Sequence, residues 1–125
     1  MGYSVQIRVR YNECDVQGIV FNANYLVYVD ETVDRWITDT IGEDAIDVVV
    51  KRATVEWQSP ARRGEILELV PAVTRWGTTS FDVTVTGSVG DRPVFVATLL
   101  YVNVLPGTKT PSRVPEDVRA ALGSA

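Results

Sequence analysis

The sequence predicts an α+β domain with one long helix and five antiparallel strands. A short alternating segment near the N-terminus is followed by a long segment with helical periodicity. Four segments with strand patterns then follow one another, separated by turns rich in glycine and proline. The chain has 125 residues, of which 46% are hydrophobic. This is enough for the packed core of one domain, which is expected to comprise residues 1–125.

The first part of the chain supplies a strand and the helix. Residues 4–11 alternate between polar and apolar, which is typical of a strand. Mostly hydrophobic residues then recur at spacings of three and four, which indicates a wide helical stripe. They are Tyr25, Tyr28, Val29, Thr32, Val33, Trp36, Ile37 and Ile41. Asn22 or Asn24 can cap this helix, and Gly42 suits its end.

Turn residues divide the remainder of the chain into strands. These strands are expected within 47–58, 65–76, 81–89 and 94–104. Pro71 marks a bulge or an edge position in the second of them, because proline cannot donate a hydrogen bond to a neighbouring strand. Pro115 begins a short terminal helix that reaches Leu122.

The strand at 94–104 is apolar at nearly every position. A strand that is apolar on both faces is normally covered on both faces. One helix covers only one side of a sheet. We therefore expect a second subunit to cover the rest.

Composition excludes several classes of function. The net charge of −4 argues against a nucleic-acid-binding surface. The chain has no histidine, which excludes Ser-His-Asp and Cys-His catalysis and most zinc sites. Cys14 is the only cysteine, so no internal disulfide can form. The N-terminus lacks a signal-peptide pattern and no apolar run could span a bilayer, so we expect a soluble cytoplasmic protein without a membrane partner.

Residues 13–25 carry the candidate chemistry. Asp15 is expected in a loop, Gly18 follows three residues later, and the helix begins soon afterwards. This order can bring a carboxylate close to the unpaired backbone amides near Phe21 and Asn22. On spacing alone, the simpler interpretation is that Asp15 stabilises a loop turn.

The other residues of this loop are expected to have lesser roles. Glu13 is expected to be solvated, with a supporting role beside the acid left open. Cys14 has no activating base nearby, so a buried and inert thiol is expected. Gly18 would let the loop turn sharply and let a substrate approach, although a plain turn glycine is nearly as good an interpretation.

Two motifs carry a resemblance to a known family. In the first, a D-x-x-G-x-V segment follows a strand, and an N-Y pair then opens a helix with a further acid and an arginine. Its residues are Asp15, Gly18, Val20, Asn24, Tyr25, Asp30 and Arg35. The second is S-P-A-R-R-G-E at 59–65, similar to a P-A-x-x-G-D turn, with Glu65 in place of the Asp. Together they resemble the acyl-CoA thioesterases with the hotdog fold, in the 4-hydroxybenzoyl-CoA thioesterase-like family.

The resemblance covers nearly the whole chain, and it implies a fold and an assembly. In the hotdog fold, a five-stranded antiparallel sheet wraps one long central helix. Two subunits would join their sheets into a dimer with active sites at its interface, and such dimers often pair into a homotetramer, so a dimer and a dimer of dimers both stay open. The implied activity is hydrolysis of an acyl-CoA or acyl-carrier-protein thioester to a free acid and a thiol, with water and without a cofactor or metal.

The resemblance also implies roles for individual residues. Asp15 would attack the thioester as a nucleophile or activate water as a general base. The family's carbonyl contact falls on Asn22, whose backbone N–H would stabilise the oxyanion. Gly18 would complete this catalytic loop. The candidate substrate-binding residues are Tyr25, Asp30 and Trp57, with Arg62, Arg63, Lys109 and Arg113 for the CoA phosphates.

Three alternatives stay open at this point. A protein of the same fold could bind or sense an acyl thioester without hydrolysing it, and such a binder would not need Asp15. A dehydratase of this fold uses a histidine as its base, so the lack of histidine weighs against it. A cone-shaped α+β ligand-binding domain would enclose a pocket beside its helices instead of wrapping one central helix.

Overall fold

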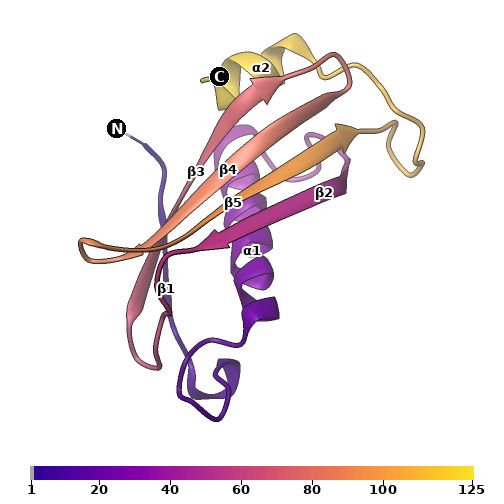
Figure 1. Cartoon of the computed structure of the whole chain (residues 1–125). Coiled ribbons are helices and arrows are strands. Elements are labelled where there is room, and N and C mark those ends of the chain that lie inside the picture. The colour runs from indigo at the N-terminus through magenta and orange to yellow at the C-terminus, as the bar shows by residue number, and fades with distance from the viewer. Residues whose placement is uncertain (1) are drawn as a thin grey trace.

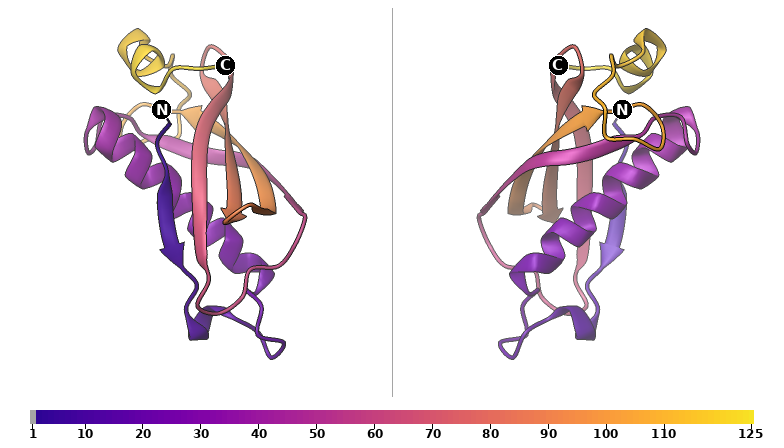
Figure 2. Two further views of the ribbon diagram at one scale, coloured as in Figure 1. Left: turned by 90° about the vertical axis from the view of Figure 1, so that its left-hand side faces the viewer. Right: turned by 90° about the vertical axis from the view of Figure 1, so that its right-hand side faces the viewer.

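The computed structural model describes residues 2–125 and confirms the predicted order of elements. The elements are β1 (Val5–Arg8), a 3₁₀ turn η1 (Tyr11–Glu13), α1 (Asn22–Ile41), β2 (Val48–Trp57), β3 (Ile66–Trp76), β4 (Ser80–Val89), β5 (Arg92–Asn103) and α2 (Glu116–Leu122). The strands form one antiparallel five-stranded sheet in the order β1-β3-β4-β5-β2. Figures 1 and 2 show this sheet curved around α1. The structure therefore has one helix wrapped by a sheet and excludes the cone-shaped alternative.

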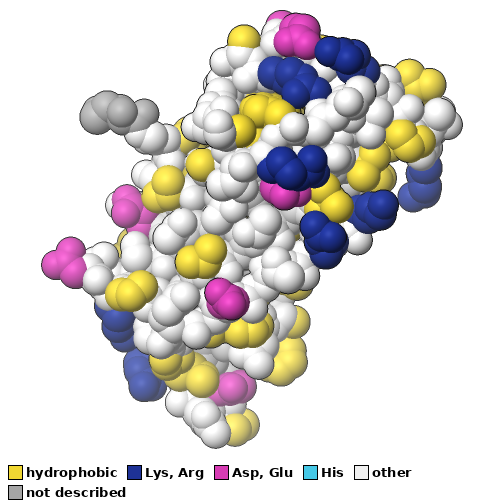
Figure 3. Space-filling view, turned by 45° about the horizontal axis from the view of Figure 1, so that its top comes forward, with side chains coloured by type: hydrophobic (Ala, Val, Ile, Leu, Met, Phe, Trp, Pro, Cys, Tyr) yellow, Lys and Arg dark blue, Asp and Glu magenta, His cyan; other side chains and the backbone are white. Residues whose placement is uncertain are grey.

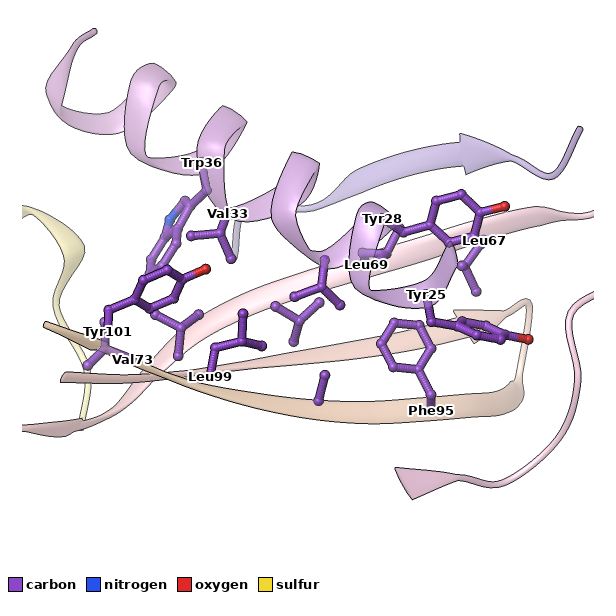
Figure 4. Packing of buried hydrophobic residues seen from close by; sticks show 14 of the residues in the cluster. Tyr25, Tyr28, Val33, Trp36, Leu67, Leu69, Val73, Phe95, Leu99 and Tyr101 are labelled. Atoms are coloured by element: carbon purple, nitrogen blue, oxygen red, sulfur yellow. The ribbon is translucent and has the colours of Figure 1, made fainter. Parts of the chain in front are cut away.

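The core lies between α1 and the inner face of the sheet. Most of the predicted stripe of α1 is buried, while Ile37 and Ile41 at its end are half-buried. The stripe packs against buried side chains of β3, β4 and β5, several of which are shown in Figure 4. Tyr25 makes edge contacts in this core with Tyr28 at 6.2 Å and with Phe95 at 5.2 Å between ring centroids. Each large side chain buried in this way contributes about 1.5–3 kcal/mol.

The predicted cap of α1 is wrong. The N-cap residue is Phe21, and no side chain caps the helix there. Asn22 and Asn24 both lie inside the first turn, and the Asn24 amide donates a 2.8 Å hydrogen bond to the carbonyl of Glu13 instead. At the other end, Gly42 closes the helix with φ of 103°, as predicted. The helix start therefore keeps backbone N–H groups that no side chain satisfies.

The two faces of β5, which is apolar at nearly every position, differ in burial. Its inner side chains are buried beneath α1, whereas its outer side chains are only half-buried. The outer residues are Val96, Thr98, Leu100 and Val102. In the described residues no further layer covers this outer face, and the predicted second subunit stays a prediction.

The two edges of the sheet differ. Pro71 of β3 lies beyond Leu69, the last residue that pairs with β1, so it occupies an edge position as predicted. At the opposite edge, β2 pairs along its length with β5 and, within residues 2–125, with no other strand. Most of β2 is exposed, including Val50 at 48% and Trp57 at 47%. Neither helix of this described part has the length and hydropathy that crossing a bilayer requires.

Candidate active site

The loop with Asp15 is a closed hairpin. Cys14 and Val20 form an isolated antiparallel bridge at its base. The Asp15 N–H donates to the carbonyl of Ile19 at 2.9 Å, and the Gly18 N–H donates to the carbonyl of Asp15 at 3.0 Å. Gly18 has φ of 78°, in the left-handed region that favours glycine. The predicted turn role of this glycine is confirmed.

The two oxygens of the Asp15 carboxylate have different surroundings. Oδ1 accepts a 2.8 Å hydrogen bond from the backbone N–H of Gln17, which stabilises the turn. Oδ2 accepts no hydrogen bond from residues 2–125, and the side chain is exposed. The loop role expected from spacing alone is present, and one oxygen stays free to face a ligand.

The start of α1 offers one of the two expected amide donors. The Phe21 N–H donates to the carbonyl of Glu13 at 3.0 Å. The expectation that this N–H is unpaired is therefore wrong. Asn22 is the first residue of α1, and its N–H has no acceptor among residues 2–125. Such a free N–H, reinforced by the helix dipole, attracts negative charge.

The structure corrects the expected environment of Glu13. Its side chain is 15% exposed and accepts hydrogen bonds from Arg10 and from the hydroxyl of Tyr28. Burial alone would raise the pKa of Glu13, but these hydrogen bonds outweigh burial and hold the pKa below its ordinary value. The Arg10–Glu13 spacing was visible in the sequence, whereas the contact with Tyr28 depends on how α1 packs.

The second motif packs against the first. The hydroxyl of Tyr25 accepts a 3.0 Å hydrogen bond from the Ala61 N–H, and the Val20 N–H donates to the carbonyl of Ala61 at 2.9 Å. Ile19 and Arg62 form a further bridge between the two segments. Burial raises the pKa of Tyr25, so this phenol stays neutral. The structure therefore joins the acid loop, the helix start and the turn after β2.

Two neighbouring cavities open at this junction, one at Gly18 and one at Ile19. The first has a volume of about 580 Å³. The predicted site residues on its wall are Asp15, Gly18 and Arg63. The second has a volume of about 270 Å³. The predicted site residues on its wall are Asn22, Tyr25 and Trp57.

The remaining predicted substrate-binding residues lie elsewhere in the chain. Asp30 borders a third cavity of about 280 Å³, further along α1, whose wall includes Tyr101 of β5. Lys109 and Arg113 lie between β5 and α2, at the end of the sheet far from the acid loop (Figure 1). Arg113 pairs with Glu116 at 3.2 Å. Figure 3 shows Lys and Arg side chains gathered at this far end. One subunit therefore does not bring Asp30, Lys109 or Arg113 to Asp15.

Tyr101 was not singled out in the sequence. It is 3% exposed and stacks on Phe81 at 5.6 Å, and its hydroxyl has no hydrogen-bond partner among residues 2–125. Figure 4 shows the ring close to Val33 and Trp36 of α1. Burial, followed by the negative charge of Asp30, raises the pKa of this phenol. No pattern in the sequence marks such a group, because its isolation depends on the packing around it.

An antiparallel sheet wrapped around one long helix is the hotdog fold. The chain belongs to the thioesterase-like superfamily, whose family model matches residues 9–122. The family and fold that the two motifs predicted are therefore confirmed.

Several known proteins resemble this chain in sequence or in structure. The acyl-CoA thioester hydrolase YbgC of Escherichia coli is 26% identical over 80 residues, which are 59% of this chain and 60% of that relative. A thioesterase superfamily structure from Jannaschia sp. CCS1 has a TM-score of 0.90 at 21% identity, covering 97% of this chain and 90% of that one. A thioesterase from Thermus thermophilus, complexed with coenzyme A and Zn, has a TM-score of 0.86 at 22% identity, covering 95% and 90%.

Proposed function

We propose that this chain hydrolyses an acyl-CoA thioester to a free carboxylic acid and CoA, with Asp15 as the catalytic carboxylate. The observation that carries the proposal is that Asp15, which has a free carboxylate oxygen, and Asn22, which has a free backbone N–H, each line a cavity at the junction of the acid loop and the start of α1. Membership of the thioesterase-like superfamily and the likeness to YbgC support it. An acyl-carrier-protein thioester is the other candidate substrate.

The proposed chemistry uses two groups of this chain. As the thioester carbon is attacked, negative charge develops on its oxygen, and the Asn22 N–H donates a hydrogen bond to it. Asp15 either attacks the carbon itself or removes a proton from an attacking water. In the first route a mixed anhydride forms, the C–S bond breaks, and the CoA thiolate leaves and takes a proton from solvent. Water then cleaves the anhydride and restores the carboxylate.

The proposed substrate contacts are divided between the two cavities. Trp57 and Tyr25 provide an apolar wall for the acyl group beside Asn22. Arg62 and Arg63 are exposed beside the acid loop, where guanidinium groups could hold the CoA phosphates. Arg63 also lies 5.7 Å from the ring of Tyr11, which orients it over the first cavity.

We further propose that the protein works as a homo-oligomer, with β2 of one copy beside β2 of a second copy. A ten-residue edge strand with free backbone groups favours such pairing. Asp30, Lys109 and Arg113 would then reach the active site of the partner subunit. A homotetramer would form when two such dimers pair. The cytoplasmic location stays a prediction.

The experiment compares thiol release by the wild type, Asp15→Asn and Asp15→Ala on a panel of acyl-CoA and acyl-carrier-protein thioesters. Loss of a catalytic acid or base lowers the rate by about 100-fold or more, so both variants should be nearly inactive while still folded. Asp91→Asn is the matched control, because Asp91 is an exposed acid in the turn between β4 and β5. Near-normal hydrolysis by both Asp15 variants would reject the proposal.

A non-catalytic acyl-thioester binder is the second candidate. The hydrogen bond from the Gln17 N–H favours it, because it gives Asp15 a structural role that needs no chemistry. The same panel separates the two candidates. A binder would show saturable binding of an acyl-CoA without any release of thiol by the wild type.

A further inference from the structure

Glu13 ties the chain just before the acid loop to the start of α1. It ends η1 and lies two residues before Asp15. Its carbonyl oxygen accepts the Phe21 N–H at 3.0 Å and the Asn24 side-chain amide at 2.8 Å. Both donors belong to the N-cap and first turn of α1. The backbone of Glu13 is therefore held at the same helix terminus that offers the free Asn22 N–H.

The carboxylate of Glu13 makes a second set of contacts. Oε1 accepts the hydroxyl of Tyr28 and the N–H of Arg10, each at 2.8 Å. Oε2 accepts two guanidinium N–H groups of Arg10, at 3.0 and 3.3 Å. These donors occupy both oxygens, and the lowered pKa keeps the group ionised. Glu13 is thus an anchor without a free lone pair aimed at a substrate, unlike Asp15.

The acid loop also has hydrogen bonds of its own. The Cys14–Val20 bridge closes the hairpin at its base, directly beside Glu13. The hydrogen bonds of Asp15 with Ile19 and Gly18 hold its tip. The hairpin is also tied to the turn after β2, at Val20 by the Ala61 carbonyl and at Ile19 by the bridge to Arg62, so Glu13 provides one of its two attachments. Glu13 holds that base through its carbonyl on the first turn of α1 and through its carboxylate on the second turn.

We propose that Glu13 is a positioning residue that sets the Asp15 carboxylate against the Asn22 N–H. The proposal rests on the proposed function, in which these two groups carry out the reaction. A displacement of about 1 Å between reacting groups can lower a rate by about 100-fold. Tyr28 acts with Glu13, since its hydroxyl fixes the carboxylate to α1.

The experiment measures kcat and KM for Glu13→Ala, Glu13→Gln and Tyr28→Phe on the thioester that the wild type hydrolyses best. For Glu13→Ala we expect kcat to fall by about 10- to 100-fold and KM to change by less than about twofold. Glu13→Gln keeps an acceptor for Tyr28 and should recover part of this loss. Tyr28→Phe removes only the hydroxyl and should lower kcat several-fold, which also serves if Glu13→Ala does not fold.

Asp82→Ala is the matched control. Asp82 pairs with Arg75 at 3.0 Å and its side chain is 17% exposed, against 15% for Glu13. It lies on β4, away from the acid loop. Loss of the Asp82 carboxylate should lower the thermal unfolding temperature without lowering kcat. An equal fall in kcat for Asp82→Ala would mean that general destabilisation, and not positioning, explains the Glu13 result.

A double variant separates this proposal from the proposed function. In the Asp15→Asn background, Glu13→Ala should cause no further loss, because the group that it positions is gone. Normal hydrolysis by Asp15→Asn would reject the proposed function itself. An inactive Asp15→Asn together with wild-type kcat in Tyr28→Phe and in folded Glu13→Ala would reject only the positioning role. A rise in KM at unchanged kcat would also reject it.

Discussion

The backbone N–H of Ala61 donates a 3.0 Å hydrogen bond to the hydroxyl of Tyr25. The two residues are 36 positions apart and both are buried, with exposures of 0% and 1%. Tyr25 belongs to the helix-start motif and Ala61 to the turn after β2. One hydrogen bond therefore joins the two motifs by which the sequence resembles its family.

Tyr25→Phe is expected to lower the free energy of unfolding by about 1–3 kcal/mol. The substitution keeps the ring and its packing but leaves the buried Ala61 N–H without an acceptor. Urea unfolding of the folded variant measures the change. A loss well below 1 kcal/mol would indicate that this N–H finds another partner.

Tyr101→Phe is expected to change the free energy of unfolding in the opposite direction to Tyr25→Phe. The hydroxyl of Tyr101 is buried without a partner among residues 2–125, and removing it should raise the free energy of unfolding by about 1 kcal/mol. The same urea experiment measures it beside Tyr25→Phe. Clear destabilisation by Tyr101→Phe would show that the hydroxyl is bonded in solution.

Gly87→Ala should be strongly destabilising. A Cβ added at Gly87 in β4 would overlap the ring of Phe95 on β5, and overpacking of this kind costs about 1–3 kcal/mol or more. Gly90→Ala is the control, because Gly90 has open space around its Cα and only its φ of 57° disfavours alanine. Thermal unfolding should show a larger loss for Gly87→Ala, and equal losses would contradict the packing argument.

Glu65 should make stability depend on pH. Burial alone would raise the pKa of Glu65, but the Arg62 N–H and the Arg92 guanidinium outweigh burial and hold this pKa below its ordinary value. Because the pKa of Glu65 is lower in the folded state than in the unfolded state, its stabilising effect is fully present at a pH above the unfolded-state pKa. That effect is lost as the pH falls through the folded-state pKa. The stability difference between wild type and Glu65→Gln should shrink from pH 7 to pH 3 in urea unfolding. A constant difference would exclude this charge effect.

Ala53→Asp tests pairing through β2. Ala53 is exposed near the middle of this edge strand, and in a β2–β2 pair the two aspartates would lie close together and repel. Sedimentation should show a smaller species than the wild type, and thiol release should fall with it. An unchanged assembly would place the interface elsewhere, while an intact monomer with full activity would contradict a shared active site.

Local patterns predicted much of the architecture. The strand and helix periods follow from side-chain direction along the backbone, so residues 25–41 and the four later strands could be recognised from spacing. Gly42 and Pro71 were interpretable because their backbone preferences are intrinsic. The cap of α1 could not be predicted, because the side chain of Asn24 donates its hydrogen bond to the carbonyl of Glu13, an acceptor that only the folded loop supplies.

The order of the elements, the lack of histidine and the acid-glycine-helix order that singles out Asp15 and Gly18 can all be read from the amino-acid sequence alone. Folding is needed to establish that the Phe21 N–H is occupied, that the Asn22 N–H is free, and that Glu13 contacts Tyr28. Periodicity and turn preference are local properties of a few neighbouring residues. Hydrogen-bond partners and burial depend on segments that meet only when α1 and the sheet pack together.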